Sequence, residues 1–182
     1  MKNLFLFILF CITISCDAQT YPLRTFNEIP ENAYLKDTNN ELPAYECTWT
    51  GTWNNKTIYI TFKKITNKYN ENLKYYKDNL IAKFKVVDIN GNILFDNTNL
   101  SDDTPKIWGG KFRKVDDKYS LIYNGPDLCN TSGTININFI DPTKTKLDWK
   151  YFYRNEIVTV DCPYYNSEIP QPLPKDIILT KQ

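Results

Sequence analysis

The sequence predicts an all-β protein, a single antiparallel up-and-down β-barrel of about eight to ten strands, with a two-sheet sandwich as the alternative. Short segments of alternating apolar and polar residues recur along the chain, and turn dipeptides such as Asn54-Asn55 and Asn90-Gly91 separate them. No amphipathic segment is long enough to indicate a long helix. Consecutive hairpins with one apolar face must close or stack to bury that face and protect their edges, which favours the barrel.

The composition is that of one globular domain, since 42% of the 182 residues are hydrophobic and 24% are charged. The net charge is +1, from 22 Lys+Arg and 21 Asp+Glu, so no excess positive field would attract a phosphate backbone. We therefore expect a monomer that does not bind nucleic acid.

Residues 1–18 have the pattern of an export signal, because Lys2 is followed by an uncharged apolar run that is too short to span a bilayer. Two cleavage sites compete. The Ile14-Ser15-Cys16 step resembles a bacterial lipoprotein box, in which Cys16 would be acylated and the membrane would be reached only through that anchor. Ordinary signal-peptidase cleavage after Ala18 is the alternative.

The signal places the mature chain outside the cytoplasm, as an outer-membrane lipoprotein of the bacterial cell envelope or as a secreted protein. Residues 19–43 carry several prolines and predict an extended N-terminal tether that wraps the outside. Residues 44–182 then form the barrel domain.

The first hairpin of that domain explains the two tryptophans in its opening strand. A two-residue turn at Asn54-Asn55 pairs Cys47 with Phe62, Trp49 with Ile60 and Gly51 with Ile58. Side chains alternate along a strand, so these residues face inward, while Thr48 and Thr50 face outward.

The next two hairpins follow the same logic. An Asn90-Gly91 turn sets Lys85 opposite Asp96 and Val86 opposite Phe95. Between these hairpins and the first, residues 67–79 are the one place where a short helix could form instead. A turn at Asp116-Asp117 would bring one set of residues to a common inward face: Trp108, Gly110, Phe112, Tyr119, Leu121 and Tyr123.

The last strands alternate equally clearly. Ile135, Ile137 and Phe139 share one face, and the Asp141-Pro142 turn leads into a strand whose inward residues are Leu147, Trp149, Tyr151 and Tyr153. Residues 156–161 and 176–181 predict two further short strands.

The cysteines of an exported domain are expected to form a disulfide before any catalytic role is considered. Cys129 and Cys162 lie at the ends of predicted elements, where pairing would stabilise the fold by about 3 to 4 kcal/mol. Cys47 would remain a buried free thiol. The chain has no histidine and no C-x-x-C pair, so neither a metal site nor a cofactor is expected.

Catalysis is not expected either, because the absence of histidine removes the usual acid–base and nucleophile constellations. The carboxylate pairs Asp102-Asp103 and Asp116-Asp117 sit beside turn residues, where adjacent side chains point apart. A carbohydrate-active enzyme on the same scaffold is the third and weakest hypothesis.

The first predicted strand resembles that of the lipocalin and calycin group, which carries Gly-x-Trp. Gly51-Thr52-Trp53 matches this motif literally, whereas Cys47-Thr48-Trp49 has the better position at the start of the strand. In that group the tryptophan plugs one end of the barrel and an arginine packs on it, a role that the resemblance would give to Arg113 or Arg154.

Over nearly its full length the chain is similar to small exported lipocalin-like proteins of Bacteroidota, a family of unknown function. The stretches that carry this similarity are "AQTYPLRT", "YLKDTNNELPAYECTWTGTW" and the closing "PLPKDIILTKQ". The resemblance implies export and a barrel, and it implies no activity.

The hypothesis of function is an exported, lipid-anchored, non-catalytic barrel that binds a small apolar or aromatic molecule in its interior. An envelope protein with a filled barrel, which docks a partner through its outer face or N-terminal arm, is the alternative. The expected cavity walls are Trp49, Trp108, Phe112, Tyr119, Tyr123, Trp149 and Tyr151.

Mass spectrometry of the protein purified from its own membranes tests the N-terminal prediction. A lipoprotein will begin at Cys16 and carry the additional mass of its acyl chains. A chain that begins at Gln19 with no added mass would contradict the lipid anchor and support cleavage after Ala18.

Overall fold

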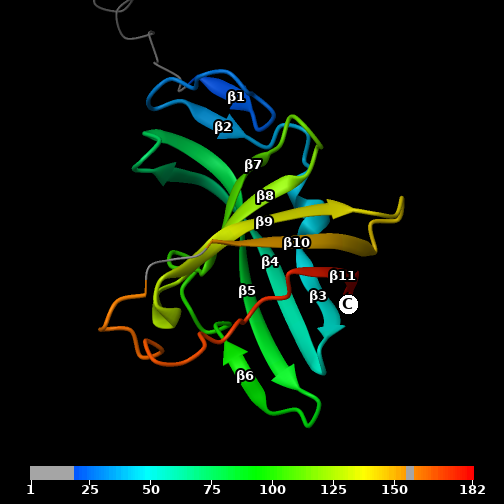
Figure 1. Cartoon of the computed structure of the whole chain (residues 1–182). Helices are drawn as coiled ribbons and strands as arrows, with labels where there is room; N and C mark the ends of the chain where they lie inside the picture. Colours follow the sequence, from blue (N-terminus) through cyan, green and yellow to red (C-terminus); the bar gives the residue numbers. More distant parts are fainter. Residues whose placement is uncertain (1–18, 155–157) are drawn as a thin grey trace, which may run out of the picture.

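The computed structural model describes residues 19–154 and 158–182, and it confirms the all-β antiparallel barrel. Eight strands close on themselves in the order β3-β4-β5-β7-β8-β9-β10-β11 (Figure 1). Their bounds are β3 Cys47–Trp53, β4 Lys56–Asn70, β5 Tyr75–Asp88, β7 Ile107–Phe112, β8 Tyr119–Gly125, β9 Thr131–Phe139, β10 Lys146–Arg154 and β11 Asp176–Lys181. Two short 3-10 turns, η1 (Leu42–Tyr45) and η2 (Pro126–Leu128), are the only helical elements of the described chain.

Three further strands extend the sheet at the two ends of the barrel. β1 (Thr20–Pro22) pairs in parallel with β2 (Tyr34–Lys36), and β2 pairs in parallel with β5. β6 (Ile93–Asp96) pairs with β5 near the opposite end of the molecule (Figure 1). The N-terminal segment 19–43 is thus wrapped onto the barrel and contributes strands to its sheet.

The register of the first hairpin is the predicted one. Trp49 lies opposite Ile60 and is fully buried, and Asn54 and Asn55 both adopt the positive φ that the turn requires. On the outer face the Thr48 hydroxyl forms a hydrogen bond with the Thr61 hydroxyl across the two strands.

The predicted pairings at the Asn90-Gly91 hairpin and the predicted inward faces of β9 and β10 are also confirmed. Trp149 lies opposite Ile137 and is fully buried, and its indole N–H donates to the Pro174 carbonyl at 3.0 Å. Buried indole nitrogens need such partners, and this bond fixes the segment before β11 against the core.

The predicted inward position of Trp108 is wrong. The register shifts between Gly109 and Phe112, where one extra residue is inserted into β7. A bulge of this kind turns over every side chain that precedes it. Ile107 is therefore fully buried, while Trp108 is half-buried on the outer face beside Ile122.

The possible short helix at residues 67–79 is not formed. These residues make the ends and turn of the β4–β5 hairpin, and the Asn70 side chain accepts backbone N–H groups of this turn. The predicted strand over residues 156–161 is wrong where the structure describes it, because residues 158–161 form loop and turn structure. The disulfide Cys129–Cys162 ties this irregular segment to the end of η2, which confirms the predicted pair. Cys16 lies outside the described residues.

The barrel closes along one edge of β5 that three strands share in succession. β2 pairs with Tyr76 and Lys77, β7 with Ile81 and Ala82, and β6 with the segment 85–87. Between these pairings, side-chain oxygens accept hydrogen bonds from backbone N–H groups of β5. Leu80 donates to the Tyr119 hydroxyl, and Phe84 donates to the Asn97 amide oxygen.

Gly109 lies where β7 meets this edge of β5. A Cβ atom at this position would lie 2.7 Å from the Leu80 carbonyl oxygen and 2.9 Å from the Leu80 nitrogen. A side chain on Gly109 would therefore push the two strands apart.

Within the described residues, no helix is long and apolar enough to cross a membrane.

Substitution of Gly109 by alanine is expected to lower the free energy of unfolding by about 3 kcal/mol, because the added methyl group overlaps the backbone of Leu80. Urea denaturation measures the change. Gly91→Ala is the control, since this glycine has φ +84° but no atom within 4 Å of the added Cβ, and it should cost about 1 kcal/mol. Equal losses for the two variants would contradict a tight seam between β5 and β7.

Candidate functional site

Six of the seven predicted wall residues fill the barrel with their own side chains. Their rings contact one another, with Phe112 and Tyr119 4.9 Å apart between centroids and Tyr123 and Tyr151 5.8 Å apart. Burial raises the pKa of the Tyr119 hydroxyl above its usual range. The buried six are Trp49, Phe112, Tyr119, Tyr123, Trp149 and Tyr151.

A cation does lie over the Trp49 ring, but it comes from neither of the two expected arginines. The Lys181 ammonium of β11 is 6.0 Å from the ring centroid, within reach of a cation–π interaction. Arg113 instead forms an ion pair with Asp116 in the β7–β8 turn. Cys47 of the same motif is a half-buried free thiol, and burial raises its pKa.

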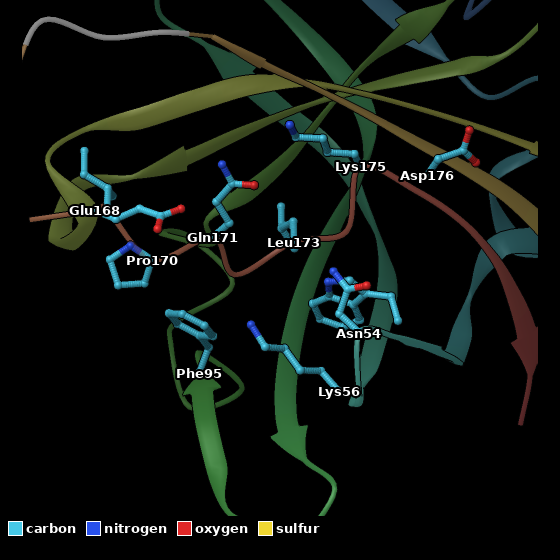
Figure 2. A pocket seen from close by; sticks show the side chains of 11 residues that line it. Asn54, Lys56, Phe95, Glu168, Pro170, Gln171, Leu173, Lys175 and Asp176 are labelled. Carbon is cyan, nitrogen blue, oxygen red and sulfur yellow. The ribbon is translucent and has the colours of Figure 1, made fainter.

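One cavity of about 700 Å³ lies outside the barrel core, between the β3–β4 turn, β6 and the segment before β11. Figure 2 shows Asn54 and Lys56 on one side of it, Phe95 on β6, and Glu168, Gln171 and Lys175 on the crossing segment. Its charged side chains have both signs, and Asp176 already pairs with Lys150. Most of its polar wall residues are exposed.

A second cavity of about 460 Å³ lies where β5 and β7 separate, and the segment 23–29 of the N-terminal arm covers it. We call it the arm cavity. Its apolar walls combine buried side chains with three exposed ones, Phe26, Leu73 and Ile122. The lining residues are Leu23, Thr25, Phe26, Asn27, Ile29, Leu35, Asn70, Leu73, Tyr75, Lys77, Asn79, Gly109, Gly110, Lys111, Phe112, Ser120, Ile122 and Thr134.

Polar contacts hold the arm in place at the start of this covering segment. The Leu23 N–H donates to the Lys36 carbonyl at 2.9 Å. The Arg24 guanidinium pairs with Glu41 and with Asp117, and it lies 4.1 Å above the centroid of the Phe112 ring. These contacts raise the pKa of Arg24, with the Glu41 hydrogen bond as the largest cause.

Lys77 is the unusual residue of the arm cavity. It is 5% exposed, and no hydrogen bond or ion pair joins its ammonium group to any side chain that the structure describes. Burial, with a smaller contribution from the nearby charge of Lys111, lowers the pKa of Lys77 to about 8. Buried lysines normally have a partner, so an unpaired one lining a cavity indicates a functional site.

Asn79 lies two residues further along β5 and therefore on the same face of the sheet. Its side-chain oxygen is buried and has no hydrogen-bond partner among the described groups. Asp78, between the two, points to the other face, where it accepts hydrogen bonds from the Tyr34 hydroxyl and the Asn67 N–H. The acid next to Lys77 in sequence is thus unavailable to it.

The carboxylate pairs considered as catalytic candidates are engaged in ion pairs. Asp102 binds Lys63 and Lys83, and Asp103 binds Lys68. The hydrogen bond from Lys63 is the largest cause that lowers the pKa of Asp102. In the part of the chain that the structure describes, no cluster of three or more acidic or cysteine side chains is arranged to hold a metal ion.

Sequence reasoning missed Lys77 and Asn79, because a polar residue at alternate positions of a strand predicts a solvated face. A weak signal was present in the arm. Leu23, Ile29 and Leu35 have no place in the barrel and need an apolar surface to cover.

The fold and this cavity define a class: an antiparallel eight-stranded β-barrel protein with a ligand-sized cavity on the outside of its wall. A family model described as "Family of unknown function (DUF6705)" matches residues 1–182, and the chain belongs to that family. No curated protein and no solved structure matches the chain.

Replacing Lys77 by methionine is expected to stabilise the protein at pH 7 by as much as about 3 kcal/mol, because it removes a buried unpaired charge of similar length. The folded pKa of about 8 lies below the unfolded value near 10.4, so the wild type gains stability as the pH rises between these values. The advantage of the variant should therefore be full below pH 8 and vanish above about pH 10.5.

Urea denaturation of both proteins at several pH values between 6 and 10.5 measures this difference. The remaining lysines, tyrosines and Cys47 titrate in both proteins and cancel in the comparison. A variant less stable than the wild type at pH 7 would show that the ammonium group has a stabilising partner.

Proposed function

We propose that this protein is an exported, non-catalytic β-barrel protein, anchored by acyl chains on Cys16, that binds a small apolar or aromatic molecule in the arm cavity. The observation that carries the proposal is a space of about 460 Å³ with mostly apolar walls, one buried lysine without a partner in the described chain and one unpaired amide oxygen. Small-molecule sites have volumes of roughly 300–1,000 Å³ and this kind of lining.

The burial of the predicted wall residues moves the proposed site from the barrel interior to its outside. Trp49, Tyr119, Tyr123 and Trp149 are fully buried and belong to one hydrophobic core cluster. Closely packed cores of this kind stabilise the fold and leave little free volume. The barrel then serves as a rigid support for the cavity.

The arm cavity is favoured over the larger cavity of Figure 2 by its walls. Leu35, Lys77, Asn79 and Phe112 are all buried, so a bound molecule would be enclosed on several sides. Burying apolar ligand surface against such walls contributes about 25 cal/mol per Å².

Attachment to a protein partner is the second candidate function, favoured by an apolar row on the outer wall. Trp108, Ile122, Thr134 and Phe152 lie side by side on neighbouring strands β7 to β10. Ile122 is 54% exposed and Phe152 is 57% exposed. Exposed apolar patches of this kind often mark interaction surfaces.

A tryptophan in place of Thr134 is expected to fill part of the arm cavity and weaken the binding of an uncharged aromatic probe at least tenfold. N-phenyl-1-naphthylamine, whose fluorescence rises in an apolar site, is a suitable probe for titration. Thr134 is half-buried on the outer face, so the larger side chain leaves the barrel core intact.

The matched control is Thr57→Trp, on the outer face of β4, because Thr57 lines neither cavity. It should bind the probe as the wild type does. Absence of probe binding by the wild type, or equal binding by Thr134→Trp, would overturn the proposed site and favour the partner-docking function.

A further inference from the structure

We infer that the arm cavity selects a monocarboxylate with an apolar body, and that the ammonium group of Lys77 binds the carboxylate. This inference rests on the proposed function, because it names the class of molecule that the same cavity takes. The geometry behind it is that of Lys77. This residue is 5% exposed, its ammonium group has no hydrogen-bond or ion-pair partner in the part of the chain that the structure describes, and it lines an otherwise largely apolar space.

The cavity has positive charge and no negative charge. Among its lining residues are the two lysines Lys77 and Lys111 and no aspartate or glutamate. The groups beside Lys77 on neighbouring strands do not change this balance. They are Leu35 on β2 and Lys68 on β4, whose ammonium is already bound to Asp103 at 2.6 Å.

The two acids that are buried in the described part of the chain, Asp37 and Asp78, already have partners. Asp78 accepts hydrogen bonds from the Tyr34 hydroxyl and from two backbone N–H groups on the opposite face of β5. Asp37 accepts the Lys64 ammonium at 2.9 Å and two backbone N–H groups at the start of η1. Rotation of either carboxylate toward Lys77 would be unfavourable, because the groups that it now binds would be left unpaired.

An unpaired buried ammonium destabilises a fold, whereas a methionine would fill the same space without that cost. Many surface lysines avoid the problem by extending the charged end into water, but Lys77 is enclosed by the arm and by β2, β5 and β7. A ligand carboxylate would remove the cost by forming a charge-assisted hydrogen bond in a site with little water.

The remaining polar group favours a carboxylate over a phosphate. Asn79, on the same face of β5, also lines the cavity, and the N–H groups of its side-chain amide can donate to a ligand oxygen beside the ammonium. Phosphate sites generally use arginine forks or clusters of backbone N–H groups, and no arginine lines this cavity. One ammonium and one amide match the two oxygens of a single carboxylate, while the apolar walls match a hydrocarbon or aromatic body.

Titration calorimetry with decanoate and with decan-1-ol at pH 7 tests this inference, because the two molecules share a chain and differ in charge. The wild type should bind decanoate at least tenfold more tightly than decan-1-ol. In Lys77→Met, decanoate binding should fall to the level of decan-1-ol, and decan-1-ol binding should be unchanged. Lys77→Met is expected to fold, because it removes a destabilising charge.

Lys68→Met is the matched control, since it removes the same charge from the neighbouring strand without touching the cavity lining. It should keep the preference for decanoate. Equal binding of the two molecules by the wild type, or an unchanged preference in Lys77→Met, would overturn the carboxylate inference and leave the proposed function standing. If neither molecule binds and the uncharged probe does not bind either, both the carboxylate inference and the proposed function would be overturned.

Discussion

Closure of the sheet along β5 is the constraint on which the rest of this structure depends. β5 is longer than the strand that closes the barrel against it, and β7 meets it through only two residue pairs, Ile81 with Trp108 and Ala82 with Ile107. Without further partners, the rest of this β5 edge would leave its backbone N–H and C=O groups unpaired. β2 and β6 pair with the two ends of that edge. Between these strands, side-chain oxygens accept hydrogen bonds from the backbone N–H groups of β5.

The same constraint creates the arm cavity. Because β7 diverges from β5 after the short seam, a wedge opens between them on the outer wall, and the N-terminal arm covers it while β2 completes the sheet. Arg24 holds this cover through Glu41, Asp117 and the ring of Phe112. The cavity is therefore formed by elements distant in sequence, and the filled aromatic core keeps its inner wall rigid.

At the arm cavity, a buried lysine without a partner lowers the stability of the fold, whereas the proposed ligand binding requires it. In the interior of the barrel, the indole N–H groups of Trp49 and Trp149 donate to backbone carbonyls. At the arm cavity, the ammonium group of Lys77 is buried without a hydrogen-bond or ion-pair partner among the described residues, and the buried side-chain oxygen of Asn79 is unpaired. Local violations of otherwise consistent rules are where functional sites are expected.

The sequence by itself determined the eight strands of the barrel and most of their registers, because these follow from local chemistry. It also indicated the disulfide, because Cys129 and Cys162 lie at the ends of predicted elements. Asparagine and glycine turns fix a hairpin pairing, and alternation then fixes which side chains face inward. It did not determine the bulge that turns Trp108 outward, since one inserted residue leaves no mark on alternation in a glycine-rich strand. Only the tertiary structure decided that the arm covers the gap between β5 and β7, and that Lys77 lies enclosed beneath it. Burial of a strand's polar face depends on which distant segment packs against it, and no local pattern encodes that contact.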